Sequence, residues 1–576
     1  MSRTYILTIA VCFLGSVLLM DSPTSALSEQ SVIVIVRLKK GYIAVKRGQR
    51  LVLKKDWPRL KDVHPLWIIN GFSATVDKRD IESLSNHPEV ASVRIDKKFR
   101  LNEAPTDSIL RSQWNLSVLN VESLRRMGIT GRGVVVCVLD TGVDIDHKYL
   151  KGKWRGGANS WFDFFDSTLL PTDSIGHGTQ VMGIILGGSE QSINGGLGIA
   201  PGAQWIAAKI FDNQGFTLLS IIHRALQWLV DPDGDPETED SPDIVNMSWG
   251  ISERPDECIQ EFSEDISKLK ELGIAVVTPA GNGGPSLFTS ESPANYNGVI
   301  SVGAIEERGE LSIFSSRGPS ACGLKVYPDL VAPGAGLYTT DITFGGIFDE
   351  ATTIVTGTSF AAAEVTGLIA LMKDAFPEMD LYSIEASLRI TAKDLGEKGP
   401  DNSYGYGLVD PLGAYTWGLN APKCLDFDHD GYFAQKDCGP LQDLDDFDPC
   451  TKALSNAKSN TVLVDISKRQ YHPGERLFVT LNTLPKGFNI FIAILLPDGG
   501  LWVLDDLNSG YAIEDARDIQ PWKGLCTILD LEIPRWSESG NYTLYSYAVP
   551  VGEDLVDPRF SKFLNETTFE IVDMPR

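Results

Sequence analysis

Short apolar runs alternate with segments of helical periodicity between residues 113 and 420. Five of these runs are expected to form buried strands, namely GRGVVVCVLD, which ends at Asp140, and then WIAAKIF, DIVNMSW, IAVVTPA and VISVGAI. Apolar residues recur every three to four positions in segments 177–188, 218–230 and 259–272, which predicts helices there. Continuous apolar strands separated by helices are typical of a parallel sheet that is covered on both faces. The pattern therefore predicts an α/β domain over residues 113–420.

The segments on either side of this region have different patterns. Residues 30–105 contain the apolar runs VIVIVRL, LWIINGFSATV and VASVRID and the helical stretch DKRDIESLSNHP, which together predict a small separate α/β unit. Residues 460–576 instead hold short alternating runs separated by turn signals such as PDGG and ESGN, which predicts an antiparallel β-sandwich. Its expected strands are TVLVDIS, RLFVTLN, FNIFIAILLP, LWVLDD, CTILDLEIP, NYTLYSYAVP and TTFEIVD.

The N-terminus has the features of an export signal. Arg3 precedes the apolar run Tyr5–Met20, and small residues follow up to Ala26, which predicts a signal peptide over residues 1–26 and a secreted protein. No later apolar run reaches spanning length, so no membrane span is expected in the mature form. Removing the signal leaves seven cysteines, an odd number, and Cys137 within VVVCVL is the expected buried free thiol. The pairing of the other six stays open.

Charge is unevenly distributed along the chain. Residues 31–101 hold roughly 16 basic and 7 acidic side chains, whereas the whole chain has a formal net charge of −25. A basic N-terminal unit joined to an acidic remainder suggests an electrostatically matched intramolecular pair. So acidic a mature surface makes nucleic acid an unsuitable partner.

Four polar residues occupy positions that a folded parallel sheet would expose at one edge. Asp140 in VLDTGVDIDH and Asn282 in PAGN follow predicted strands, and sites in open parallel sheets form beyond the carboxyl ends of strands. His177 in GHGT opens a predicted helix, and Ser359 in GTSFAA opens an Ala-rich helix that stops before Pro377. Backbone N–H groups at the start of that helix lie close to any negative charge that forms beside Ser359.

The motifs around Asp140, His177 and Ser359, in this order, resemble those of the subtilases, the family of subtilisin-like serine proteases. The resemblance covers roughly residues 113–415, and DPDGDPETEDSPDIVNMSWG is most similar to bacillopeptidase-F-type members. It implies that His177 is the general base for Ser359, that Asp140 orients the imidazole, and that Asn282 and the Ser359 N–H stabilise the oxyanion. The stretch IINGFSATVDKRDIESLSNHPEVASVRID resembles the subtilase propeptide, a folding chaperone and tethered inhibitor.

The same resemblance assigns two edges of the substrate cleft. Residues Ser248, Trp249 and Gly250 in NMSWG would form one wall of the pocket for the residue before the scissile bond, and Pro279, Ala280 and Gly281 would form another. The chain departs from the family at Ala363 and Glu364, where Pro and His are usual, and this is expected to alter helix packing rather than remove a catalytic group.

Two acidic segments are candidates for structural Ca²⁺. Residues 421–456 hold a D-x-D-x-D-G start, and Asp426, Asp428, Asp430 and Asp437 are the predicted ligands, since hard cations need many oxygens. An acidic linker stapled by cysteines is the alternative there. A second candidate set is Asp231, Asp233 and Asp235, but a solvated loop is the favoured interpretation there, since the spacing alone does not supply the six or more oxygens that Ca²⁺ needs. No cofactor is required for the chemistry itself.

The leading hypothesis is a secreted serine endopeptidase that cleaves polypeptides through an acyl-enzyme. It would be made as a self-processing zymogen, with its own propeptide as intramolecular inhibitor and a processing site between Leu101 and Gln113. A second hypothesis is a catalytically idle, subtilase-like extracellular binding protein, and a third is an esterase that uses the same three residues. A serine-directed fluorophosphonate distinguishes the first two, because an idle protein takes no label.

Overall fold

The computed structural model describes residues 31–39, 57–102, 113–189 and 197–420, apart from five single positions, and the strands between 464 and 571. The predicted signal peptide and the Asp-rich segment with Asp426, Asp428, Asp430 and Asp437 lie outside these residues. The described chain forms two compact units, which divide between Lys97 and Lys98.

The first unit is a four-stranded antiparallel sheet in the order β2-β3-β1-β4. Its elements are β1 (Ser31–Leu38), β2 (Lys61–Leu66), β3 (Gly71–Asp77), the short helix α1 (Ile81–Ser85) and β4 (Val90–Ile95). The predicted strand LWIINGFSATV begins later than expected, because Trp67–Ile69 form a 3₁₀ turn that closes at Asn70 with φ 49°. Strand β2 was not predicted, since it is largely polar, contains Pro65 and lies at the sheet edge.

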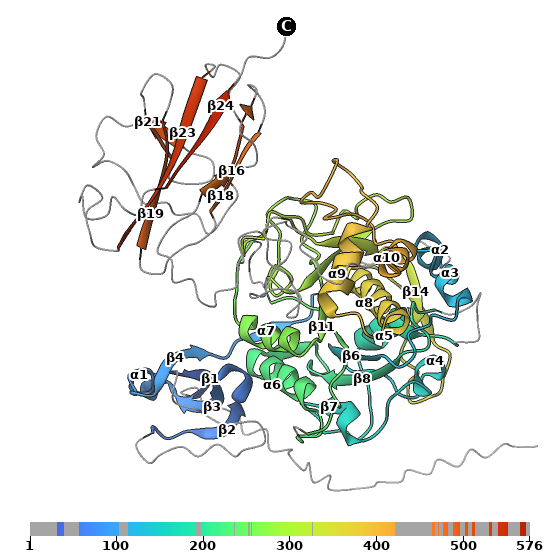
Figure 1. The fold of residues 1–576 in the computed structure, drawn as a ribbon. Coiled ribbons are helices and arrows are strands. Elements are labelled where there is room, and N and C mark those ends of the chain that lie inside the picture. The colour runs from blue at the N-terminus through green and yellow to red at the C-terminus, as the bar shows by residue number, and fades with distance from the viewer. Residues whose placement is uncertain are drawn as a thin grey trace, which may run out of the picture. The chain divides into compact units, whose positions relative to one another are not determined.

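The second unit is built around a seven-stranded parallel sheet in the order β13-β12-β11-β10-β6-β8-β7 (Figure 1). The strands are β6 (Val135–Asp140), β7 (Trp161–Asp163), β8 (Gln204–Lys209), β10 (Ile244–Asn246), β11 (Ala275–Pro279), β12 (Ile300–Ile305) and β13 (Leu330–Pro333). The five predicted strands and their parallel arrangement are confirmed. The edge strands β7 and β13 have three and four residues, too few for a periodic signal.

Helices cover both faces of this sheet. Figure 1 shows α5 (His177–Leu186) and α8 (Thr358–Ala375) on one side and α6 (Leu219–Val230) and α7 (Ser263–Glu271) on the other. Helix α8 packs against β10, β11, β12 and β13 and is buried from Thr358 to Met372. Its small residues allow this close approach; a Cβ at Gly367 would lie 2.5 Å from Cβ of Ile199. Helix α8 is therefore the central support of the domain.

Shorter elements complete the second unit. They are the helices α2 (Trp114–Val118), α3 (Val121–Arg126), α4 (Lys148–Lys151), α9 (Leu381–Ile390) and α10 (Pro411–Gly418), and the hairpin of β14 (Leu337–Thr340) and β15 (Thr352–Val355). Strand β5 (Lys98–Arg100) pairs antiparallel with β9 (Phe216–Leu218). The Leu101 N–H extends this pairing by donating to the Gly215 carbonyl at 2.9 Å.

The strands after residue 460 form two sheets, β16-β18-β22 and β17-β24-β23-β19-β20-β21. Each of the seven predicted segments contains one strand: β16 (Val464–Ile466), β18 (Arg476–Leu481), β19 (Phe488–Leu495), β20 (Leu501–Leu504), β22 (Leu529–Glu532), β23 (Gly540–Pro550) and β24 (Asn565–Ile571). The short β17 (Gln470–Tyr471) and β21 (Gly510–Ala512) were not predicted. The pairs are antiparallel except β17 with β24, and the packing of the two sheets as a sandwich stays a prediction.

Three cysteines lie within the described residues. Cys258 and Cys322 form a disulfide, and Cys137 is buried and free in β6, as expected. Among the described helices, none combines the length and apolar character that a membrane crossing requires.

Candidate active site

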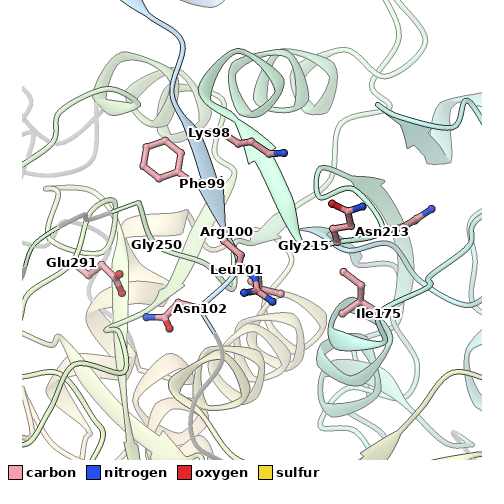
Figure 2. Close-up of a pocket in the computed structure, with 11 residues that line it drawn as sticks. Lys98, Phe99, Arg100, Leu101, Asn102, Ile175, Asn213, Gly215, Gly250 and Glu291 are labelled. Carbon is pink, nitrogen blue, oxygen red and sulfur yellow. The ribbon is translucent and has the colours of Figure 1, made fainter. Parts of the chain in front are cut away.

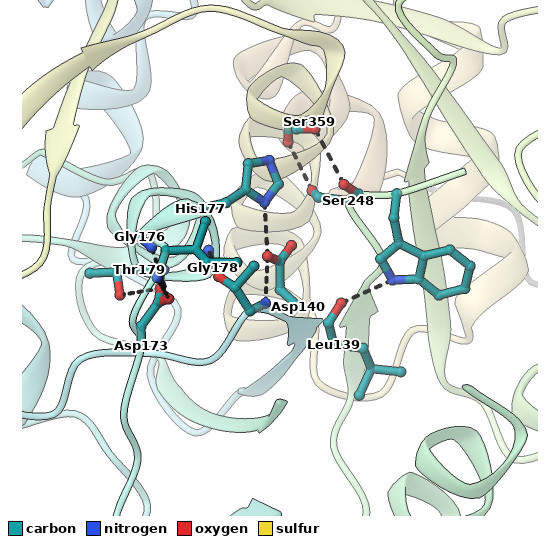
Figure 3. Close-up of polar contacts among 12 residues, drawn as sticks. Leu139, Asp140, Asp173, Gly176, His177, Gly178, Thr179, Ser248 and Ser359 are labelled. Atoms are coloured by element: carbon teal, nitrogen blue, oxygen red, sulfur yellow. Dashed lines mark hydrogen bonds and ion pairs between the residues drawn. The ribbon is translucent and has the colours of Figure 1, made fainter. Parts of the chain in front are cut away.

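Three of the predicted residues meet at one edge of the parallel sheet. Asp140 is the last residue of β6, His177 is the first residue of α5, and Ser359 is the second residue of α8 (Figure 3). Because one residue ends a strand and the other two begin helices, their side chains lie at the edge of the sheet rather than within it. All three are at least nine-tenths buried, so their polar atoms interact in an environment with little water.

Asp140 and His177 form a direct hydrogen bond. Nδ1 of His177 lies 2.8 Å from Oδ1 of Asp140, and the Thr141 N–H donates to the same oxygen at 2.7 Å. Because the Asp140 carboxylate can only accept, Nδ1 of the neutral ring carries the proton and Nε2 is left as the acceptor. The pair therefore orients the imidazole with its basic nitrogen directed away from Asp140.

The residue that follows Ser359, Phe360, packs against this imidazole. Figure 3 shows the His177 ring between Asp140 and Ser359, and the ring centroid lies 5.7 Å from that of Phe360, the next residue of α8. The Ser359 hydroxyl donates to the Ser248 carbonyl at 3.3 Å, and the Ser248 hydroxyl donates to the Ser359 carbonyl at 3.1 Å. These reciprocal bonds hold the first turn of α8 against the segment that follows β10.

Asn282 has a fixed orientation next to the start of α8. The backbone N–H and the hydroxyl of Thr358 both donate to Oδ1 of Asn282, at 3.1 and 2.9 Å. A backbone N–H can only donate, so the side-chain oxygen must face Thr358 and the NH₂ group must face the other way. The amide is therefore set to donate a hydrogen bond near Ser359.

The predicted substrate walls follow β10 and β11. Trp249 is anchored by its indole N–H, which donates to the Leu139 carbonyl at 2.9 Å, and it is buried rather than exposed to a cleft. Pro279 ends β11, and Ala280 and Gly281 are buried, so Gly250 is the wall residue that lines a cavity.

A cavity of about 800 Å³ lies beside these walls (Figure 2). The segment Lys98–Asn102 lines it, together with Asn213–Gly215, Ile175, Gly250 and Glu291. Glu291 was not predicted from the sequence, because it is a single carboxylate in the loop SESPAN and matches no motif. Burial raises the pKa of Glu291 to about 7.

Comparison with known proteins identifies the family. The subtilase family model matches residues 131–407, and the peptidase inhibitor I9 model matches residues 61–102. Subtilisin E of Bacillus subtilis (strain 168) is 31% identical over 347 residues, which cover 59% of this chain and 80% of that protein. This chain belongs to the subtilase family.

Two other relatives from the same bacterium are matched over smaller parts of their length. Bacillopeptidase F is 29% identical over 419 residues, and minor extracellular protease Epr is 27% identical over 392 residues. Each match covers 66% of this subtilase, but only 28% of bacillopeptidase F and 54% of Epr. The predicted resemblance to subtilases with an inhibitory propeptide is confirmed.

This subtilase carries a buried acid at Glu364, one of the two positions predicted to depart from the family pattern. Glu364 is fully buried in α8, and its Oε1 accepts from the Asn115 amide at 2.6 Å. Burial raises the pKa of Glu364 to about 8, although the Asn115 hydrogen bond and the positive charge of Arg125 oppose this. The neighbouring Ala363 is also fully buried. Both residues therefore contribute to packing behind the active site.

One group of carboxylates suits a metal ion. Oxygens of Asp231, Asp233 and Asp240 lie within 4.8 Å of one another. Oδ2 of Asp240 accepts from the Asp233 N–H and from Asn159, whereas its buried Oδ1 has no hydrogen-bond partner within the described residues. Asp240 takes the place predicted for Asp235, whose side chain instead accepts from the Glu237 N–H. This donor set consists of oxygens alone and fits a hard cation such as Ca²⁺.

Proposed function

We propose that this subtilase is a secreted serine endopeptidase that hydrolyses peptide bonds through Asp140, His177 and Ser359. The observation that carries the proposal is the 2.8 Å hydrogen bond between Asp140 and His177 beside the buried Ser359 at the start of α8. A serine hydroxyl is a weak nucleophile at neutral pH and needs an adjacent base, and an imidazole needs a partner that fixes its tautomer. Its named relatives include bacillopeptidase F and subtilisin E, which supports a protease rather than an esterase.

In the proposed acylation step, Nε2 of His177 accepts the Ser359 proton while Oγ attacks the carbonyl carbon of the scissile bond. The carbonyl oxygen becomes anionic in the tetrahedral intermediate. The Asn282 amide, oriented by Thr358, and the N–H groups at the start of α8 stabilise this charge. The imidazolium then gives its proton to the leaving amine, and the C–N bond breaks to leave an acyl-enzyme.

Deacylation repeats these roles with water as the nucleophile. His177 accepts a proton from the attacking water, the oxyanion forms in the same place, and the proton returns to Ser359 as the acid product leaves. Asp140 orients the imidazole and stabilises the imidazolium in both steps.

We further infer that the chain is made as a zymogen. The match to peptidase inhibitor I9 ends at residue 102, and residues 98–101 pair with β9 as an extended strand beside the cavity. An extended strand is the form in which a protease aligns a substrate backbone, so this segment can occupy the cleft and be cut just beyond it. The proposed domains are a signal peptide (1–26), a propeptide (30–105), a catalytic domain (113–420), an Asp-rich segment (421–456) and a β-sandwich (460–576).

Labelling with a fluorophosphonate tests the proposed function. The wild-type protein is expected to take one label, to release its propeptide and to cleave casein, whereas Ser359→Ala should do none of these. Ser267→Ala is a matched control, because Ser267 is an exposed serine on α7 whose hydroxyl bonds to the Ser263 carbonyl. Absence of label on wild-type protein freed of its propeptide would favour the idle binding protein, and propeptide release by pure Ser359→Ala protein would contradict self-processing.

We also propose that Ca²⁺ stabilises the fold through Asp231, Asp233 and Asp240, in addition to the predicted site at Asp426, Asp428, Asp430 and Asp437. A cation that binds only the folded state raises the melting temperature by mass action. Excess chelator should therefore lower the melting temperature of the wild-type protein. Asp240→Asn should reduce the Ca²⁺-dependent shift, while Asp235→Asn should retain it. An identical shift in wild type and Asp240→Asn would exclude this cluster.

A further inference from the structure

Glu291 projects its carboxyl group into the space between the two predicted substrate walls. A Cβ atom placed on Gly250 would lie 2.4 Å from Cδ and 2.7 Å from Oε2 of Glu291. A Cβ placed on Gly281 would lie 2.6 Å from the same Oε2. One carboxylate oxygen therefore lies next to both walls, and a side chain at either wall position would force Glu291 to move.

The backbone of Glu291 is fixed to one of these walls. The Glu291 N–H donates to the hydroxyl oxygen of Tyr327 at 3.2 Å, and the Tyr327 hydroxyl in turn donates to the Ala280 carbonyl. Tyr327 is completely buried, so this link is protected from water. The backbone of Glu291 is therefore tied to the Pro279–Gly281 wall.

The carboxyl group has no cationic partner in the described part of the chain. No salt bridge of Glu291 is found there, and burial alone accounts for the rise of its pKa to about 7. The two cations nearest along the cavity-lining strand are directed elsewhere. Lys98 Nζ lies 4.1 Å and the Arg100 guanidinium 5.8 Å from the centroid of the Phe216 ring. The pocket thus presents a carboxyl group without a cationic partner among the described residues, and a cationic ligand would favour its ionised form.

The path of the chain's own strand indicates which ligand position meets Glu291. Residues 98–101 run along β9, and Asn102 is the next residue to line the cavity, on the side of Gly250 and Glu291 (Figure 2). Asn102 carries an amide, a neutral hydrogen-bond donor. A substrate strand in the same place would bring one side chain between the two walls, and a cationic side chain would neutralise the carboxylate as well as bond to it.

We propose that Glu291 is a specificity-determining residue that selects arginine or lysine immediately before the scissile bond. The inference rests on the proposed endopeptidase function. An apolar side chain in this pocket would cover the carboxyl group without pairing with it, which is unfavourable. A charge-assisted hydrogen bond should favour a basic over an apolar side chain by at least about 10-fold in kcat/KM.

The test compares fluorogenic peptides that differ only at this position, carrying Arg, Lys, Asn, Leu or Phe. Wild-type protein is expected to cleave the Arg and Lys peptides at least about 10-fold more efficiently than the Leu and Phe peptides. Glu291→Gln keeps the shape but removes the charge, and it should lose this preference, so that the ratio of kcat/KM for the Arg peptide to that for the Leu peptide falls toward one. Glu310→Gln makes the same change of charge at an exposed site and should behave as wild type.

A second measurement separates this inference from the proposed function. Peptide amides that end in Arg or Leu are tested for protection against thermal unfolding, which requires no turnover. Protection by the Arg peptide that is lost in Glu291→Gln would support the pocket assignment even in a protein that takes no label. Normal labelling with equal cleavage of Arg, Asn and Leu peptides, or an unchanged Arg preference in Glu291→Gln, would overturn it.

Discussion

Replacement of Glu364 by glutamine tests whether this subtilase keeps a neutral acid behind its active site. Oε1 accepts from the Asn115 amide, whereas Oε2 of Glu364 and Oδ1 of Asn115 are buried without hydrogen-bond partners in the described residues. A proton on Oε2 would supply the donor that this arrangement lacks. Glutamine places an NH₂ group at the same position and supplies a donor at every pH.

The size of the effect follows from the pKa. Burial raises the pKa of Glu364 from 4.5 to about 8, so the folded state binds this proton more tightly than the unfolded chain does. The contribution of this proton to the free energy of unfolding is fully present below pH 4.5 and is lost as the pH rises through about 8. One pKa unit corresponds to about 1.4 kcal/mol, which gives a loss on the order of 5 kcal/mol by pH 9. The glutamine variant has no such loss.

Urea unfolding followed by tryptophan fluorescence at pH 5, 7 and 9 measures this difference. All variants should carry Ser359→Ala, so that proteolysis does not contribute. Glu364→Gln is expected to match its parent near pH 5 and to be more stable by several kcal/mol at pH 9, while Glu310→Gln should follow the parent throughout. A stability difference between Glu364→Gln and its parent that does not change with pH would refute the reasoning, because it would mean that Glu364 is already ionised in the fold.

Three further predictions concern the same domain. Asn282→Ala should lower kcat by about 10²–10³ with little change in KM, measured with a peptide substrate; the magnitude is that known for subtilisin, a member of this family. Burial lowers the pKa of His223, but Asp265 and Glu261 outweigh it and raise the pKa to about 9, so His223→Gln should lose stability below pH 6.5 and approach wild type above pH 9, measured by urea unfolding. Cys258→Ser combined with Cys322→Ser opens a loop with a sequence separation of 64 and should cost about 4 kcal/mol of unfolding free energy, whereas an unchanged urea midpoint would show that the disulfide contributes nothing.

The sequence was sufficient to predict the sheet, the pairing of Asp140 with His177 and the position of Ser359 at the start of a helix, for a physical reason. Each residue lies at the end of a strand or the start of a helix, and those boundaries are encoded locally by apolar runs, glycines and a proline. In a parallel sheet such ends are brought to one edge, so local signals were enough to predict proximity. Their catalytic roles stay proposals that labelling must test.

Residues whose role depends on loop geometry could not be predicted in this way. The Glu291 carboxyl group lies between Gly250 and Gly281, which belong to two other loops. The residues next to Glu291 in the sequence give no indication of this position. The acidic loop gives a second example. The spacing made Asp235 a candidate ligand beside a favoured solvated loop, but the structure groups Asp240 with Asp231 and Asp233 instead. Strand β2 was missed because an edge strand needs no continuous apolar face.

The separation of the three proposed catalytic residues along the chain has a consequence for the cell that makes this protein. Asp140 and Ser359 are more than two hundred positions apart, and they approach each other only once β6, β10 and α8 have assembled. A nascent or half-folded polypeptide therefore holds a serine without its base. The proposed hydrolytic activity would therefore be absent until synthesis and folding of the whole sheet are finished.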